Sequence, residues 1–198
     1  MPLALQDKFA LLEKIDEKLK EELLDYMEKG KTVVIFGTEP FISSPTSFQL
    51  SIAGRTTGHL ATVIAKHPIM DRFPHRGFCA KQFENMLNGG SAAVLDGAPD
   101  THNPIIDIAT SYKNAKREGL LFEYRVSNGR LLVCTLHLDD ADPAARWLKN
   151  SILTYVNSCA FAPQSVIAVD TLRQICTGDA LAEDSDSNRA VNKNDITA

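Results

Sequence analysis

The sequence has few cysteines, no long apolar run and only one tryptophan, and the first two features each exclude a class of protein. Its cysteines, Cys79, Cys134, Cys159 and Cys176, form no CxxC pair, so we expect neither a disulfide framework nor a zinc site. No segment approaches the ~20 consecutive apolar residues of a membrane span, and the N-terminus lacks the apolar core of a signal peptide. The sequence therefore predicts a soluble, cytoplasmic protein.

An excess of basic residues is also missing. The 21 lysines and arginines are outnumbered by 25 aspartates and glutamates and are spread among them, which gives a net charge of −4. Binding to nucleic acid depends on a basic surface that releases counterions, so we expect no nucleic-acid partner, and likewise no membrane partner. We also expect no cofactor.

Length and composition indicate a single domain. The chain has 198 residues and 44% apolar content, which is enough for one hydrophobic core but not comfortably for two. The last 22 residues have too little apolar content to offset the entropy lost on ordering. We therefore predict one domain over residues 1–176 and a disordered tail over 177–198.

The strongest local signals lie between residues 119 and 158. Two apolar runs, Leu120–Val126 and Arg130–Leu138, flank a Ser-Asn-Gly segment that can supply the positive φ of a tight hairpin. Asp142 and Pro143 then fit the N-cap and first residue of a helix. Its apolar positions recur at helical spacing: Leu148, Ile152, Tyr155 and Val156. The sequence therefore predicts a β-hairpin followed by a closing helix.

Earlier segments favour an α/β fold. Apolar residues at every third or fourth position over Leu5–Lys29 predict one long amphipathic helix that ends at Gly30, with a coiled coil as the alternative. The β-branched run Thr32–Phe36 is typical of a strand buried on both faces of a parallel sheet, and Ser91–Leu95 predicts a second buried strand. We therefore expect a three-layer fold, with a mostly parallel sheet flanked by helices.

The remaining elements are shorter. Ser51–Arg55 and Leu60–Ile64 alternate as two short strands around a Thr-Gly turn, and Gln82–Leu87 begins a helix. Ser165–Val169 predicts a last short strand, followed by a helical turn. Ile105–Tyr112 fits a strand and a helix equally well by periodicity alone.

A polar loop follows the strand predicted at 32–36. It contains Thr38, Glu39, Ser43 and Ser44, and loops at the carboxyl ends of parallel strands are where α/β folds usually place their sites. We identify Thr38, Glu39 and Ser43 as candidate binding residues. The alternative is that this segment is only a solvated loop.

His137 is the candidate catalytic base, because it ends a predicted strand and precedes Asp139 and Asp140, which could orient its imidazole. A base also needs a nucleophile, and Cys79 is the weak candidate for that role. No strand precedes Cys79, and a lysine stands where a nucleophile elbow needs a small residue. The alternatives are a histidine held by nearby backbone and an ordinary semi-buried cysteine.

Two further kinds of site find little support. His59, His67 and His75, with Asp71 between them, lie eight residues apart across prolines, unlike the spacing of regular metal sites, so we expect no metal. Trp147 could stack on a sugar ring, but its place in an amphipathic helix predicts a core position.

Four segments resemble the C-terminal region of family-2-type bacterial glycoside hydrolases. They are HPIMDRFPHRGFCAKQF (67–83), SAAVLDG (91–97), GLLFEYRVSNGRLLVCTLHL (119–138) and PAARWLKNSILTYVNSCAFAP (143–163). The resemblance covers residues 19–175 and implies a flavodoxin-like module similar to class I glutamine amidotransferases. The strand that ends in His137 is similar to the one that carries the histidine of those enzymes, whereas their cysteine elbow has no match.

The resemblance implies a non-catalytic accessory domain, or a fragment, of a glycoside hydrolase that acts in carbohydrate degradation. Its partner would be the catalytic barrel of the parent enzyme or a second copy of the chain. Gln82 is retained where the family tends to carry several tryptophans, and we keep it as a candidate residue for binding carbohydrate. Two alternatives stay open: a stand-alone hydrolase or amidotransferase-like enzyme that uses His137 and a cysteine, and a carbohydrate-binding module.

Overall fold

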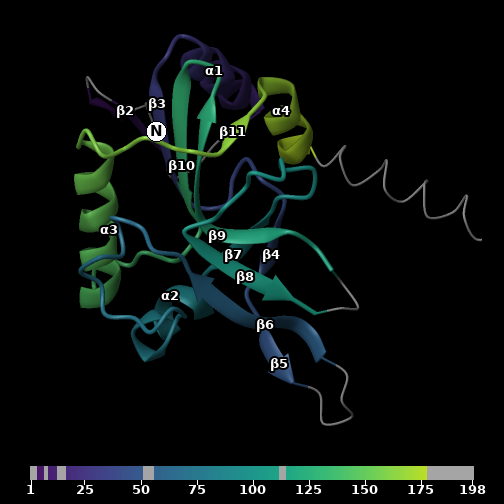
Figure 1. Cartoon of the computed structure of the whole chain (residues 1–198), viewed down its shortest axis with the longest axis vertical. Helices are drawn as coiled ribbons and strands as arrows, with labels where there is room; N and C mark the ends of the chain where they lie inside the picture. The colour runs from purple at the N-terminus through teal and green to yellow at the C-terminus, as the bar shows by residue number, and fades with distance from the viewer. Residues whose placement is uncertain (1–3, 7–8, 13–16, 51–55, 112–114, 178–198) are drawn as a thin grey trace, which may run out of the picture.

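A computed structural model describes residues 4–6, 9–12, 17–50, 56–111 and 115–177 (Figure 1). Its strands are β1 (Ala4–Gln6), β2 (Phe9–Leu12), β3 (Thr32–Phe36), β4 (Ser43–Pro45), β5 (Phe48–Leu50), β6 (Thr56–Ile64), β7 (Ser91–Val94), β8 (Ile106–Thr110), β9 (Glu118–Val126), β10 (Gly129–Cys134) and β11 (Val166–Ile167). Its helices are α1 (Glu17–Glu28), the 3₁₀ turn η1 (Lys81–Phe83), α2 (Glu84–Asn88), α3 (Pro143–Val156) and α4 (Val169–Thr177).

The strands form one mixed, mostly antiparallel sheet that curls into a half-barrel (Figure 1). Its main path runs β1-β2-β3-β10-β9-β8-β6-β5, while β7 and β11 pair with β9, and β4 pairs with β7. Among the described strands, only β2–β3, β3–β10 and β9–β11 run parallel. The expected three-layer, mostly parallel, flavodoxin-like fold is therefore wrong.

The reason lies in how successive strands connect. A parallel pair needs a crossover of a dozen or more residues, usually a helix, whereas an antiparallel pair needs none. The consecutive strands β8, β9 and β10 each pair antiparallel with the next. The run Ser91–Leu95 is buried as expected, but β7 pairs antiparallel with both β4 and β9. A buried apolar strand therefore does not reveal the direction of its partner.

The single helix expected over Leu5–Lys29 is also wrong in its first half. Strands β1 and β2 form an antiparallel pair, and only Glu17–Glu28 is helical. Strand β2 pairs in parallel with β3 and so supplies hydrogen-bond partners along one edge of that buried strand. Helix α1 then buries three apolar side chains against the sheet: Leu23, Leu24 and Met27.

The hairpin and the helix that follows it are confirmed, with one correction to the end of the second strand. Val126 pairs with Gly129 across the turn, and the carboxylate of Asp142 accepts a hydrogen bond from the Ala144 amide as the N-cap of α3. The second strand ends at Cys134, so His137 lies three residues beyond it. The positive φ of 53° belongs to Ser127.

The shorter elements are partly confirmed. Thr32–Phe36 is a strand buried on both faces, η1 and α2 begin and end near the predicted bounds, and β11 is followed by α4. The segment of unsettled periodicity contains strand β8. The expected Thr-Gly turn is wrong, because Thr56–Ile64 is one continuous strand. Residues 51–55, and the predicted tail beyond Thr177, lie outside the described residues.

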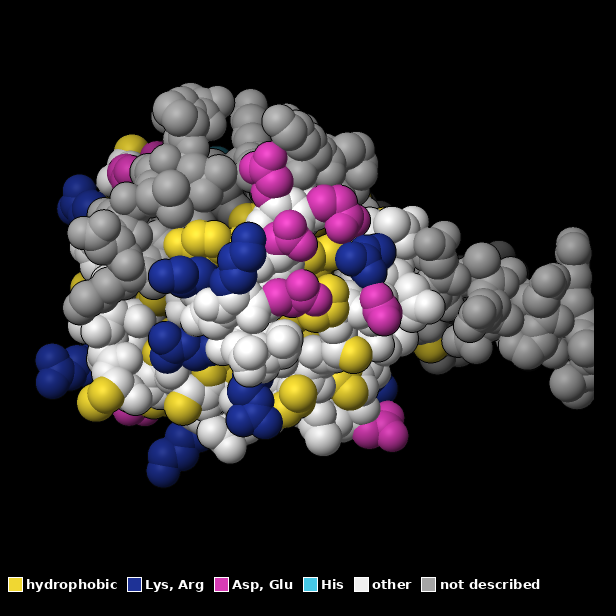
Figure 2. All heavy atoms as spheres, turned by 90° about the horizontal axis from the view of Figure 1, so that it is seen from above, with side chains coloured by type: hydrophobic (Ala, Val, Ile, Leu, Met, Phe, Trp, Pro, Cys, Tyr) yellow, Lys and Arg dark blue, Asp and Glu magenta, His cyan; other side chains and the backbone are white. Residues whose placement is uncertain are grey.

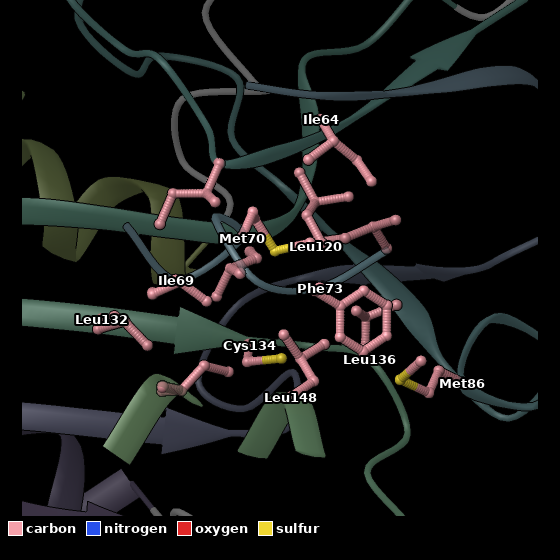
Figure 3. Close-up of a cluster of buried hydrophobic side chains, with 14 of the residues drawn as sticks. Ile64, Ile69, Met70, Phe73, Met86, Leu120, Leu132, Cys134, Leu136 and Leu148 are labelled. Atoms are coloured by element: carbon pink, nitrogen blue, oxygen red, sulfur yellow. The ribbon is translucent and has the colours of Figure 1, made fainter. Parts of the chain in front are cut away.

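The sheet separates two hydrophobic cores. One, shown in Figure 3, lies between the sheet, α3 and the segment before α2, and includes Met70, Phe73, Met86, Cys134 and Leu148. The other lies under α1 and α4. Alternate residues of β3 and β10 enter opposite cores, so helices cover both faces of this central pair.

Figure 2 looks down on the end of the molecule where α1 and α4 lie. Acidic and basic side chains stand next to one another there, with hydrophobic side chains between them. Arg173 of α4 pairs with Glu21 of α1 at 3.3 Å and with Asp170 at 2.7 Å. No helix in the described part of the chain is long and apolar enough to cross a membrane.

Candidate functional site at the carboxyl ends of β3 and β10

An open polar cleft of about 490 Å³ lies where the parallel strands β3 and β10 end. Its lining comes from four places in the chain: the end of β3, the α2–β7 connection, the segment after β10, and α3. The residues that carry its chemistry are Thr38, Ser91, Thr135, His137 and Lys149. The structure thus brings together two of the predicted site residues, Thr38 and His137, although they are 99 positions apart.

Local backbone contacts fix the position of His137. Its amide donates to the carbonyl of Met86 at 3.0 Å, and its side chain lies against Gly89. A Cβ atom added to Gly89 would lie 2.9 Å from Cγ of His137, so only glycine leaves room for the side chain in this position. The imidazole is exposed and faces an open cleft.

The acidic residues after His137 do not orient its imidazole. Asp139 accepts a hydrogen bond from the Ala141 amide at 2.9 Å, and Asp140 pairs with Lys149 at 3.2 Å. No side chain in the described part of the chain forms a hydrogen bond with the ring of His137. The base–carboxylate pair that the sequence predicts, His137 with Asp139, is therefore not formed.

The other predicted binding residues are dispersed. Ser43 lies in β4 and pairs with Ala93 of β7, which takes it outside the lining of the cleft. Glu39 is exposed and precedes a cis proline. The Gln82 amide donates to the carbonyl of Pro74, so this side chain holds the loop before η1.

The candidate thiol Cys79 does not lie in this cleft, and neither does Cys134. Cys79 lines a separate apolar cleft with Phe48, Leu60 and Phe78, and burial raises its thiol pKa to about 11, although the hydrogen bond with Thr62 acts in the opposite direction. Burial likewise raises the pKa of Cys134 to about 12. Because the thiolate is the nucleophilic form, both cysteines are unreactive thiols at neutral pH.

His59, His67 and His75 occupy separate places in the structure. His59 pairs with Glu118, His67 lies 3.7 Å from Glu123, and Nδ1 of His75 accepts a hydrogen bond from a nearby backbone amide. Within the described residues, no group of three or more histidine, cysteine or acidic side chains is placed to hold a metal ion.

Sequence reasoning missed a buried polar network that joins β6, β9 and β4. Nε2 of His59 lies 2.6 Å from Glu118, and the other carboxylate oxygen accepts the Ser44 hydroxyl at 2.8 Å. The Ser47 amide donates to Nδ1 of His59, so Nε2 carries the proton that is donated to the carboxylate. Ser44 contacts the carboxylate instead of the imidazole, which is not the order of a Ser–His–acid triad. We interpret the network as structural.

The expected core position of Trp147 is also wrong. Its side chain is 37% exposed, and one side of the indole packs on Phe73 with ring centroids 5.1 Å apart. The adjoining face of α3 provides the core side chains, among them Leu148 and Ile152. An amphipathic pattern identifies the helix well, but it assigns residues at the border of the apolar stripe poorly.

The fold and the cleft define a class: a mixed α/β domain with an open polar cleft whose described lining places no cysteine beside the histidine. Residues 14–177 match the model of a family described as a domain of unknown function (DUF8487), and the chain belongs to this family. A comparison with curated proteins finds no match.

Proposed function

We propose that the chain is a non-catalytic accessory domain of a glycoside hydrolase, which supports the assembly or the substrate side of a catalytic barrel in the parent enzyme. The hydrolase part of this proposal is supported by the resemblance of the segments at 67–83, 91–97, 119–138 and 143–163. That resemblance spans residues 19–175, nearly the same stretch as the family match over 14–177. The resemblance is one of sequence only. The pairing of the strands excludes the amidotransferase-like fold.

The separation of His137 from the cysteines carries the non-catalytic part of the proposal. Nucleophilic catalysis requires a base within hydrogen-bond reach of an activated nucleophile. His137 lines the polar cleft, while Cys79 lines another cleft and Cys134 is fully buried with its pKa raised to about 12. The stand-alone enzyme that would combine His137 with a cysteine therefore finds no support in this geometry.

The test compares the chain alone with the chain joined to its parent barrel. The coding sequence beside this chain should contain such a barrel, and the two segments should elute together when they are expressed as one protein or as a pair. Deletion of the chain should lower the thermal stability or the glycosidase activity of the barrel. The chain alone should not turn over glutamine or aryl glycosides.

One result would overturn the proposal directly. If the isolated chain hydrolyses glutamine or an aryl glycoside, and His137→Ala removes that activity while the surface variant Glu84→Ala preserves it, the domain is an enzyme. A neighbouring sequence without a glycosidase barrel would argue equally against the accessory role.

A further inference from the structure

A second open groove, of about 530 Å³, runs between α3 and the loop that joins β6 to η1. In Figure 1 this loop lies beside the lower part of α3. We call the groove between this loop and α3 the Trp147 groove. The residues that matter for its chemistry are Asp71, Arg72, Trp147, Asn150, Ser151 and Thr154. Its volume is within the range of small-ligand sites in proteins, about 300–1,000 Å³.

Trp147 is the exposed aromatic side chain of the groove and is held rigidly. Phe73, which supports one side of the indole, is only 4% exposed and belongs to the larger core. Leu148 and Ile152 anchor the same helix in that core with no exposed surface (Figure 3 labels Phe73 and Leu148). An exposed aromatic ring on a fixed helix can stack on a ligand at little entropic cost.

Unpaired polar groups line the same groove as the indole. The exposed side chains of Asp71, Arg72 and Asn150 form no hydrogen bond or ion pair with any residue that the structure describes. The hydroxyls of Ser151 and Thr154 donate to helix carbonyls at 3.1 and 2.8 Å, which leaves their oxygen lone pairs free to accept. The groove thus offers donors and acceptors around one aromatic ring.

This combination discriminates between classes of ligand. The groove contains one carboxylate and one guanidinium, so it has no net charge that would select a polyanion such as nucleic acid. Of the exposed large hydrophobic side chains in the described residues, Trp147 alone lines this groove, whereas a protein interface centres on several apolar anchors. A sugar ring offers an apolar C–H face for the indole and equatorial hydroxyls for the groups around it.

We propose that the Trp147 groove binds an oligosaccharide, with a sugar ring stacked on Trp147 and its hydroxyls bound by Asp71, Arg72 and Asn150. The inference stands apart from the accessory role, because the isolated chain should bind the sugar whether or not a catalytic barrel is attached.

The first experiment screens the fluorescently labelled chain on an array of neutral and acidic oligosaccharides, beside an array of peptides. At least one oligosaccharide should bind. Trp147 is the sole tryptophan, so its emission should shift to shorter wavelength during a titration with that oligosaccharide. An array without a bound oligosaccharide would overturn the proposal, and so would binding confined to peptides, which would indicate a protein-docking surface.

Variants then locate the binding site. Trp147→Ala should weaken binding at least tenfold in isothermal titration calorimetry, and Asp71→Ala and Asn150→Ala should each weaken it about threefold or more. Phe78→Ala is the matched control, because this aromatic side chain is 47% exposed in a different cleft and should not change the affinity. If Trp147→Ala does not fold, the affinities of Asp71→Ala and Asn150→Ala decide whether the sugar binds in this groove. Unchanged affinity in folded variants would contradict the assignment.

Discussion

His137, the cysteines and the buried acid–base pair show how single residues are used in this domain. The histidine is exposed above a glycine, and Cys79 and Cys134 are held as thiols by burial. Glu118 accepts from His59 and Ser44, which are both distant in sequence, inside the fold.

Alkylation should distinguish the cysteines at neutral pH. Cys159 is exposed and should react first with iodoacetamide. Cys79, with its pKa raised to about 11, should react much more slowly, and Cys134 only when the protein is unfolded. Peptide mass spectrometry over a time course measures the order in which the cysteines are alkylated. Labelling of Cys79 as fast as that of Cys159 would indicate an activated thiolate and revive the enzymatic alternative.

Removal of the Glu118 carboxylate should destabilise the protein strongly. In Glu118→Ala, His59 and the Ser44 hydroxyl both lose their buried acceptor, which should lower the free energy of unfolding by about 3 kcal/mol. Urea denaturation measures the difference. Glu84→Ala serves as the control, because its carboxylate is 48% exposed and pairs only at the surface, and should cost about 0.5 kcal/mol or less. Equal stabilities of the two variants would mean that the network contributes little.

At the scale of elements, α3 begins at a well-defined cap. Asp142 accepts from the Ala144 amide at 2.8 Å and from the side-chain amide of Asn85 at 3.1 Å. The backbone hydrogen bond from Ala144, and then the side-chain bond from Asn85, hold the pKa of Asp142 below its ordinary value of 3.8. This cap fixes the start of the helix that carries both Lys149 of the polar cleft and Trp147 of the second groove.

The contribution of this cap to stability should depend on pH. A carboxyl group whose pKa is lowered in the folded state stabilises that state above the ordinary aspartate pKa, and this contribution is lost as the pH falls through the lowered value. Asp142→Ala should therefore melt at a lower temperature than the parent at neutral pH, with a smaller difference in strong acid. Asp142→Asn keeps a capping oxygen and should remain close to the parent at neutral pH. Scanning calorimetry at several pH values measures the melting temperatures. A difference in melting temperature between Asp142→Ala and the parent that does not depend on pH would contradict the assigned role.

At the scale of the whole molecule, the end of the β9–β10 hairpin joins the two halves of the chain. The Arg130 amide donates to the carbonyl of Lys31, and β10 lies parallel to β3. A Cβ atom on Gly129 would lie 2.5 Å from the carbonyl oxygen of Lys31 and equally close to that of Met27. These contacts are with backbone, which cannot rotate away as a side chain can.

Gly129→Ala should therefore lower the free energy of unfolding by about 3 kcal/mol, because the turn must move away from the end of α1. Asn128→Ala, at the neighbouring exposed position, should change it by about 0.5 kcal/mol or less. Chemical denaturation of both variants provides the comparison. A Gly129→Ala variant as stable as the control would show that the hairpin end can separate from α1 without cost.

The sequence by itself determined the pieces whose signals are local. The cap at Asp142, the tight turn in the Ser127-Asn128-Gly129 segment and the continuous β-branched run at 32–36 each depend on neighbours a few positions away, and the structure confirms all three elements. Within that segment the positive φ falls on Ser127, and Gly129 lies close to the backbone of α1.

Only the tertiary structure decided strand direction, the partners of buried polar groups and the composition of the cleft. Apolar strands look alike in parallel and antiparallel sheets, so β7 and the N-terminal strands could not be placed from their patterns. His59 and Glu118 are 59 positions apart, and no local pattern connects them. Thr38 and His137 line one cleft because β3 and β10 end side by side, and this adjacency is a property of the sheet and not of either segment.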